Sequence, residues 1–313
     1  MPVAGVDLGG TNIAAAVVDD AHRIMGRARR RTPTEGPESV VRAITRLVGD
    51  LDPAPEAVGV GVPGPIREGV VQTAPNLSGW QGRVPVQAQL EAALGLPVVV
   101  DNDANVGALG EWLAGAGRGA RFLLGVWLGT GIGAGLVLDG RPYTGAFGGA
   151  GEIGHVVVQR GGDLCGCGRR GCLEAYAGRA AMERIVVGHI EAGRETVLPE
   201  LQAQKGKRRM TSGVWAEALE RGDAVAVEVF DDAIDALGVA LGGAVNLLDL
   251  DAIVVGGGVA EKLGPPLAER LERAMQEWLL VPDVDRRVVV AELGDDAGVI
   301  GAAALARERV LTA

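Results

Sequence analysis

The sequence has few cysteines, few aromatic residues and no excess of basic residues, and each shortage excludes a class of protein. Three cysteines in 313 residues are too few for the disulfide framework of a small secreted domain. Aromatic residues make up 3% of the chain while 48% of its residues are hydrophobic, so the core must consist of Val, Leu, Ile and Ala. A formal net charge of −10 argues against a nucleic acid or a membrane surface as the main partner.

Targeting and membrane-spanning segments are also missing from the sequence. The first ten residues, MPVAGVDLGG, contain no positively charged region followed by an apolar one, so we expect no secretory signal. The longest uncharged run, residues 122–138, is shorter than the roughly 20 residues that span a bilayer and is interrupted by glycines. We therefore expect a cytoplasmic protein.

Apolar strands alternate with helical stretches along the chain, which predicts an α/β fold with mixed sheets. The expected strands are residues 3–8, 12–18, 23–31, 57–66, 97–100, the start of 252–260, and 287–293. The expected helices are residues 38–48, a short run ending at 90, 104–114, 178–192, 224–248, 264–279 and 297–308. Residues 193–212 are expected to form an exposed loop or a surface helix end, and residues 115–120 a hinge or boundary. The basic run from Arg27 to Arg31 is typical of the solvated edge of a strand.

One segment of the sequence repeats another. Residues 5–20 (GVDLGGTNIAAAVVDD) align without a gap with residues 125–140 (GVWLGTGIGAGLVLDG), and seven of the sixteen positions are identical. Each copy is a strand, a glycine turn and a second strand. The repeat predicts two similarly built lobes that face each other.

All three cysteines lie within one short stretch, at Cys165, Cys167 and Cys172, and His155 precedes them by ten residues. Three thiolates and an imidazole make a complete tetrahedral set for Zn²⁺, with no open position for a water molecule. We therefore predict a structural zinc site rather than a catalytic one. Glu152 and Glu174 are interleaved with these ligands, and the site would hold both carboxylates in place.

Three glycine-rich turns follow strands, at residues 9–11, 129–135 and 256–258. Backbone amides in such turns can surround phosphate oxygens. Thr11 and Thr130 add hydroxyl groups to two of the turns. Asp7 precedes the first turn inside a buried strand, where a carboxylate needs a cation or a donor, and a water molecule bound to Mg²⁺ would suit it.

Asp103 follows the apolar strand at 97–100, at the kind of strand end where ligands bind in open α/β sheets. From this position it can either cap the next helix or act as a general base. A base here would accept a proton from an alcohol that attacks a γ-phosphoryl group, and Asn102 would hold a hydroxyl group within reach.

These motifs together resemble the ROK family of sugar kinases, and among them the bacterial ROK glucokinases. The similarity extends along essentially the whole chain. The matching segments are DLGGTN (7–12), GVPGPI (61–66), APNLSGW (74–80), DNDANVGALGE (101–111), LGTGIGAG (128–135), GEIGH (151–155), CGCGRRGCLE (165–174) and NLLDLDAIVVGGGV (246–259). Two positions depart from the family pattern. Asn12 stands where lysine is common, and YAGRA (176–180) replaces the Ser-Gly pair that follows Tyr-Ala in many glucokinases.

The resemblance implies a two-lobed actin-like (ribonuclease H-like) ATPase fold with a cleft between the lobes. It implies a glucokinase, which uses Mg-ATP to phosphorylate the 6-hydroxyl of glucose. Asp103 would be the general base. The residues implied for sugar binding are Gly64, Asn76, Asn102, Asp103, Glu152, His155 and Glu174. Those implied for ATP binding are Asp7, Gly9, Gly10, Thr11, Asn12, Thr130, Gly131, Gly133, Gly256, Gly257 and Gly258.

Several alternatives stay open at the level of sequence. A kinase for fructose, mannose, allose or N-acylmannosamine would keep nearly every motif, and polyphosphate is an alternative donor to ATP. A non-catalytic sugar-binding regulator is the alternative from another class. The ROK repressors carry a DNA-binding domain before the first phosphate motif, whereas here the first strand begins at Val3. The expected domains are residues 1–118 and 119–313, with the last helix able to pack on the first domain. The family resemblance further implies a homo-oligomer, either a dimer or a tetramer.

Overall fold

The computed structural model describes residues 1–74 and 77–312, without the side chains of residues 311 and 312. Contacts divide the chain into two compact units. The first unit contains Met1–Gly125, Gly135–Gly151 and the chain from Glu292 onward, and the second contains Val126–Ala134 and Glu152–Ala291. This division differs from the boundary predicted between residues 118 and 119. The reason is local packing: a Cβ added to Gly135 would lie 2.6 Å from the carbonyl oxygen of Ala104, within the first unit.

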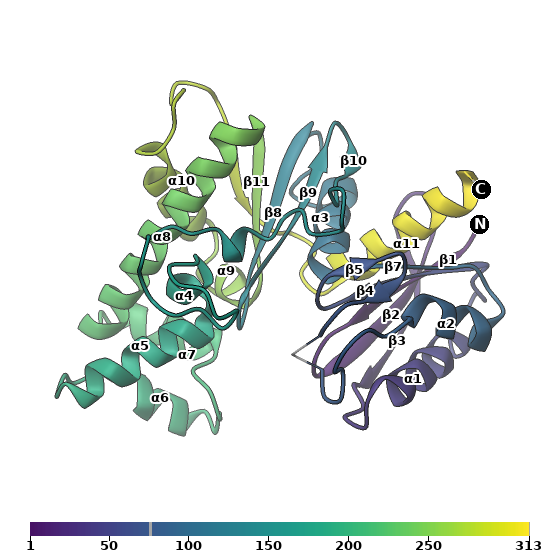
Figure 1. Ribbon diagram of the computed structural model, residues 1–313, viewed down its shortest axis with the longest axis horizontal. Helices are drawn as coiled ribbons and strands as arrows, with labels where there is room; N and C mark the ends of the chain where they lie inside the picture. The colour runs from purple at the N-terminus through teal and green to yellow at the C-terminus, as the bar shows by residue number, and fades with distance from the viewer. Residues whose placement is uncertain (75–76, 313) are drawn as a thin grey trace. The chain divides into compact units, whose positions relative to one another are not determined.

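A five-stranded mixed sheet forms the centre of the first unit (Figure 1). Its strand order is β3-β2-β1-β4-β7, in which β1, β4 and β7 are parallel while β2 is antiparallel to both of its neighbours. The strands are β1 (Val3–Leu8), β2 (Asn12–Val18), β3 (Ile24–Arg31), β4 (Ala57–Val62) and β7 (Val98–Asn102). The basic run lies on the edge strand β3, where Arg27 pairs with Asp296 at 2.6 Å and Arg30 with Asp50 at 2.8 Å. The predicted solvated strand edge is therefore confirmed.

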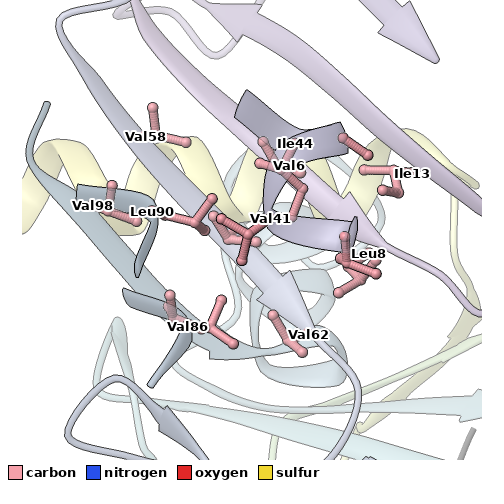
Figure 2. Close-up of a cluster of buried hydrophobic side chains, with 14 of the residues drawn as sticks. Val6, Leu8, Ile13, Val41, Ile44, Val58, Val62, Val86, Leu90 and Val98 are labelled. Carbon is pink, nitrogen blue, oxygen red and sulfur yellow. The ribbon is translucent and has the colours of Figure 1, made fainter. Parts of the chain in front are cut away.

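Helices cover both faces of this sheet. One face packs against α1 (Pro37–Gly49) and α2 (Val86–Leu94), the other against α3 (Asp103–Ala114) and α11 (Asp296–Thr312). Figure 2 shows the first interface, where Val41 and Ile44 of α1 and Leu90 of α2 meet side chains of the sheet. The α2 helix continues four residues beyond the predicted end at Leu90. A short hairpin of β5 (Ile66–Arg67) and β6 (Val70–Val71) also lies in this unit.

The backbone of α11 approaches the sheet very closely. A Cβ added to Gly5 of β1 would lie 1.7 Å from the carbonyl oxygen of Val299, and one added to Gly59 of β4 would lie 1.8 Å from that of Ala302. Only glycine leaves room for the helix at these two positions. Because side chains alternate along a strand, Asp7 lies on the same face of β1 as Gly5. The close approach therefore brings the first turn of α11 to Asp7.

A fully buried carboxylate connects α3 to the segment before α11. Glu111 has no exposed surface, and its two oxygens accept hydrogen bonds from the backbone N–H groups of Ala116, Glu292 and Leu293 at 2.9, 3.2 and 2.8 Å. Within the predicted hinge or boundary at residues 115–120, this carboxylate binds the backbone of Ala116. The sequence analysis gave Glu111 no role of its own.

The second sheet has the order β10-β9-β8-β11-β12. Its strands are β8 (Phe122–Leu128), β9 (Ile132–Leu138), β10 (Arg141–Pro142), β11 (Ala252–Gly256) and β12 (Arg287–Val290). In each sheet, two consecutive strands joined by a glycine turn are neighbours: β1 and β2 in the first sheet, β8 and β9 in the second. The next strand along the chain (β3 or β10) lies beside the second of the two. Two further strands (β4 and β7, or β11 and β12) lie beside the first. This order agrees with the predicted repeat of residues 5–20 and 125–140.

The helices of the second unit are α4 (Glu174–Ala177), α5 (Arg179–Glu191), α6 (Leu198–Gln204), α7 (Ser212–Glu220), α8 (Ala224–Leu248), α9 (Gly258–Leu263) and α10 (Pro265–Gln276), with a 3₁₀ turn η1 (Ile153–His155). The helices α5, α8 and α10 agree with the prediction, whereas α4, α6 and α7 lie outside the predicted helical ranges. Of these, α6 lies in the stretch 193–212 and buries Leu198 and Leu201 completely. Asp223 fixes the start of this helix by accepting the backbone N–H of Val197 at 2.8 Å. Among the described helices, none combines the length and the apolar character needed to cross a membrane.

Replacement of Glu111 by Ala should destabilise the first unit strongly. The substitution leaves three partly buried N–H groups without their acceptor, and each unsatisfied group costs about 1–3 kcal/mol. We expect the free energy of unfolding to fall by at least about 3 kcal/mol, measured as the midpoint of urea unfolding by circular dichroism. Glu35 is exposed and offers a matched control, since Glu35→Ala should leave the midpoint nearly unchanged. Equal midpoints for the two variants would contradict the anchoring role of Glu111.

Candidate active site

The first glycine turn is fixed by a residue that lies outside the predicted motif. Gly9 N–H donates to the carbonyl oxygen of Asn12 at 3.0 Å and closes the hairpin. Thr32, just after β3, donates its hydroxyl to the Gly9 carbonyl at 2.6 Å and its N–H to that of Thr11 at 2.9 Å. Two carbonyl groups of the turn are therefore directed toward Thr32. The predicted residues Gly9, Gly10, Thr11 and Asn12 form this turn, and Thr32 had no local sequence signal.

Asp7 lies two residues before the turn, next to the start of α11. A Cβ added to Gly298 would lie 3.0 Å from the Asp7 carboxyl carbon, so a small residue at 298 makes space for the carboxylate. Burial, followed by repulsion from Asp103 and Asp295, raises the pKa of Asp7 to about 7, although Arg29 acts in the opposite direction. Asp7 and Asp103 therefore belong to one acidic group within the first unit.

Asn102, not Asp103, is the N-cap of α3. Its side-chain oxygen accepts the N–H groups of Ala104 and Asn105 at 2.9 and 3.3 Å, the usual capping arrangement. Asp103 stands at the first helical position, at the carboxyl end of β7, and its Oδ1 also accepts the Ala104 N–H at 2.9 Å. The buried Asp101 supports this junction by accepting the Asn105 side-chain N–H at 2.9 Å.

The same asparagine connects α3 to the predicted sugar loop. Its side-chain N–H₂ group donates to the carbonyl oxygen of Gly64 at 3.1 Å. Gly64 has a φ of 95°, and an added Cβ would lie 2.0 Å from the Thr73 carbonyl oxygen, so only glycine is tolerated here. Gly64, Asn102 and Asp103 thus lie together in the first unit. The predicted residue Asn76 lies outside the described residues.

The three cysteines and His155 converge in the second unit. Their ligand atoms all lie within 4.8 Å of one another, with 3.7 Å between the sulfurs of Cys167 and Cys172 and 3.8 Å between the Cys165 sulfur and His155 Nδ1. Sulfurs of a tetrahedral zinc site with bonds of about 2.3 Å lie roughly 3.8 Å apart, so the geometry fits this metal. Because Nδ1 faces the sulfurs, Nε2 of His155 is directed away from the cluster.

Glu174 connects the cysteine cluster to the second glycine turn. Its Oε1 lies 3.9 Å from the Cys165 sulfur, and its Oε2 accepts the Ile132 N–H at 2.9 Å. A Cβ on Gly131 would lie 2.2 Å from the same Oε2, so glycine is required for this contact. One oxygen of Glu174 is therefore engaged with the turn, a contact that the sequence analysis did not foresee.

Glu152 precedes the single turn of η1, and His155 is its last residue. The His155 N–H donates to the Glu152 carbonyl at 3.0 Å, and Gly154 between them packs on β9, where an added Cβ would lie 2.5 Å from the Ile132 carbonyl oxygen. The start of β9 thus contacts both η1 and Glu174. The polar residues on either side of the cysteine cluster are held against the second glycine turn.

The third glycine turn lies beside the second. Gly257 has a φ of 89°, and a Cβ there would lie 2.6 Å from the carbonyl oxygen of Leu128, the residue that precedes the second turn. A Cβ on Gly256 would lie 2.9 Å from the Trp127 indole nitrogen, and one on Gly258 would lie 2.6 Å from the Ser212 hydroxyl. Ser212 was not among the predicted site residues. The second turn itself is closed by Gly129 N–H donating to the Gly131 carbonyl at 3.0 Å, followed by the exposed Gly133.

The structure thus assembles two groups of predicted residues, one in each unit. The first unit combines two carboxylates, a hairpin turn and a capped helix start, a set suited to cation binding and proton acceptance. The second combines two adjacent glycine turns with the cysteine cluster and its neighbouring polar residues, a set suited to binding phosphates and hydroxyl groups.

Comparison with known proteins shows the family that the chain resembles along its length. Residues 3–309 match the model of the ROK family. A glucokinase of Streptomyces coelicolor is 37% identical over 313 residues, which cover 97% of each chain.

Two solved structures superpose on nearly the whole chain. The first is a ROK family glucokinase from Streptomyces griseus in complex with glucose and AMPPNP, which is 36% identical with a TM-score of 0.82 and covers 98% of this chain and 100% of its own. The second is a ROK hexokinase from Thermus thermophilus, which is 35% identical with a TM-score of 0.86 and full coverage of both chains. These likenesses confirm the predicted actin-like ATPase fold. Because the family model and these relatives span almost every residue, the chain belongs to the ROK family.

Proposed function

We propose that this protein is a glucokinase that transfers the γ-phosphoryl group of ATP to the 6-hydroxyl of glucose, giving glucose 6-phosphate and ADP. The observation that carries the proposal is the full-length likeness to a ROK glucokinase whose structure contains glucose and AMPPNP. The position of Asp103 at the carboxyl end of β7, beside an asparagine that caps α3 in its place, supports it.

In this proposal Asp103 is the general base. Its carboxylate accepts the proton of the sugar hydroxyl as that oxygen forms a bond to the γ-phosphorus, while the bond from phosphorus to the β-phosphate oxygen breaks and ADP leaves. Phosphoryl transfer needs little covalent help from a protein, so the remaining residues act by positioning and by stabilising charge.

The proposed sugar contacts come from both groups of residues. Asn102, Gly64 and Asn76 would bind hydroxyl groups from the first unit, and Glu152, His155 and Glu174 from the second. The Nδ1 of His155 faces the cysteines, which leaves Nε2 for the sugar. Glu174 already accepts the Ile132 N–H with one oxygen, so its sugar contact falls to the other.

The glycine turns are the proposed phosphate and nucleotide sites. Gly9, Gly10, Thr11 and Asn12 form the first, Thr130, Gly131 and Gly133 the second, and Gly256, Gly257 and Gly258 the adenosine side. Asp7 fits Mg²⁺, because burial and the nearby Asp103 disfavour its charged form and a divalent cation would relieve both effects. When bound, Mg²⁺ neutralises charge on the phosphates.

Structural Zn²⁺ held by His155, Cys165, Cys167 and Cys172 is part of the proposal. The close ligand distances and the soft donor set support it. The metal would fix the loop that carries Glu174 and η1.

Four further expectations stay predictions: the domains 1–118 and 119–313, the cleft between lobes, the cytoplasmic location and the homo-oligomer.

A kinase for another hexose is the alternative within the enzyme class, because hydroxyl discrimination depends on contact geometry. Assays of the purified protein with glucose, fructose, mannose, allose and N-acylmannosamine, each with ATP or polyphosphate, test this point. We expect kcat/KM for glucose with ATP to exceed every other pair by roughly tenfold or more. A higher value for another sugar would reassign the substrate. Absence of turnover with all of them would favour a sugar-binding regulator.

Replacement of Asp103 by Asn should lower kcat by roughly 10²–10⁴-fold, because the amide cannot accept the hydroxyl proton. Glucose and ADP binding, measured by calorimetry, should stay close to that of the parent protein, since Asn102 and not Asp103 caps α3. A kcat within a few-fold of the parent would remove Asp103 from the mechanism.

Replacement of Cys167 by Ser should release the metal and weaken glucose binding more than ATP binding. We expect zinc content, measured by mass spectrometry, to fall from one ion per chain toward none, with a rise in the glucose KM of roughly tenfold. Leu164→Ser is a matched control, because Leu164 is an exposed residue of the same loop without a ligand atom. An unchanged glucose KM in the metal-free variant would reduce the cluster to a stabilising element of the loop.

A further inference from the structure

Arg179 makes side-chain contacts to residues of two glycine-turn regions of the second unit. One terminal nitrogen donates to the Thr130 hydroxyl at 3.2 Å, and the other donates to the Ser212 hydroxyl at 3.2 Å. Thr130 belongs to the second turn, and Ser212 contacts Gly258 of the third. The guanidinium group therefore lies where these two turns approach each other.

The backbone around Arg179 holds this position firmly. Arg179 is the first residue of α5, and its N–H donates to the Gly129 carbonyl at 3.2 Å, while the N–H of Ala180 donates to the Thr130 carbonyl at 3.0 Å. The start of the helix is thus bound to the second turn. The Arg179 side chain also donates a hydrogen bond to this turn, at the hydroxyl group of Thr130.

The positive charge of Arg179 is not neutralised by a carboxylate at salt-bridge distance within the described parts of the chain. Its two hydrogen-bond partners are neutral hydroxyl groups. Glu183, one helical turn further on, pairs instead with Arg209 at 2.7 Å. Arg179 is half-buried, and burial lowers the pKa of its guanidinium group, as does the nearby Arg209, although Glu183 acts in the opposite direction. A cation in this environment is suited to an anionic ligand.

We propose that Arg179 is a phosphate-binding residue that donates hydrogen bonds to the phosphate chain of the phosphoryl donor. This inference rests on the proposed function, in which the second and third turns bind ATP. Thr130 and Ser212 hold two of the five N–H groups of the guanidinium, and the others are available in its fixed plane for phosphate oxygens.

The proposal is tested with Arg179→Gln, which removes the charge and keeps much of the length. A charge-assisted hydrogen bond to phosphate should be lost, so we expect the Kd for ADP and the KM for ATP to rise roughly 10- to 100-fold. Adenosine carries no phosphate, and its Kd, measured by calorimetry, should change less than about twofold. The glucose KM should stay unchanged. Arg179→Lys keeps the charge without the planar fork and should give an intermediate loss.

Arg184→Gln is the matched control, because Arg184 is an exposed arginine on the same helix. It should leave ADP, ATP and adenosine binding unchanged. Inorganic tripolyphosphate, as a competitor of ATP, should lose potency in Arg179→Gln as ADP does, which would assign the contact to the phosphate chain itself.

Two outcomes would overturn the proposal. Equal losses for adenosine and ADP would mean that Arg179 only braces the two turns, and unchanged ADP binding would mean that it does not reach the phosphates. These binding measurements do not depend on which sugar is phosphorylated. Failure of the proposed function, seen as no turnover with any hexose, is therefore distinguishable from failure of the Arg179 contact.

Discussion

The close backbone contact between α11 and the first sheet is the constraint on which the first unit depends. Positions 5 and 59 have no room for a side chain, and because both residues are glycine the helix lies directly on β1 and β4. The last helix of the chain thereby covers its first strand. Asp7, the next residue on the same face, meets the start of that helix, and Gly298 leaves space for its carboxylate. The buried Glu111 fixes the segment that enters α11. The packing of α11 on the sheet therefore also determines the surroundings of Asp7.

In the second unit, two side chains fix the second glycine turn by hydrogen bonding. Glu174 accepts the Ile132 N–H while it lies beside the cysteine cluster, and Arg179 donates to Thr130 and Ser212. The second glycine turn is thus held from two sides, by a carboxylate and by a guanidinium group. A loop fixed in this way keeps its amides in place before a ligand arrives, which lowers the cost of binding.

In the proposed chemistry, the acidic group of the first unit would accept a proton and hold a cation. Residues of both units would bind phosphates and sugar hydroxyl groups. Asn102 has two structural contacts at this position, since it caps α3 and donates to the Gly64 carbonyl oxygen. In the proposal for Arg179, its guanidinium group would add a formal charge beside the backbone amides of the glycine turns, and a charged donor strengthens hydrogen bonds to phosphate.

The sequence by itself determined the features that depend on local spacing. The period of the apolar residues located most strands and helices, and the spacing of Cys165, Cys167 and Cys172 predicted their cluster with His155. The repeat of residues 5–20 predicted two similarly built lobes, and the two sheets have matching strand orders. The tertiary structure decided what depends on distant partners. Examples are the hydrogen bonds of Thr32 to the first turn, those of Glu111 to the segment before α11, the burial of Leu198 and Leu201 of α6, and the contacts of Glu174 and Arg179. No local pattern records such contacts, because they form only when packing brings separate segments together.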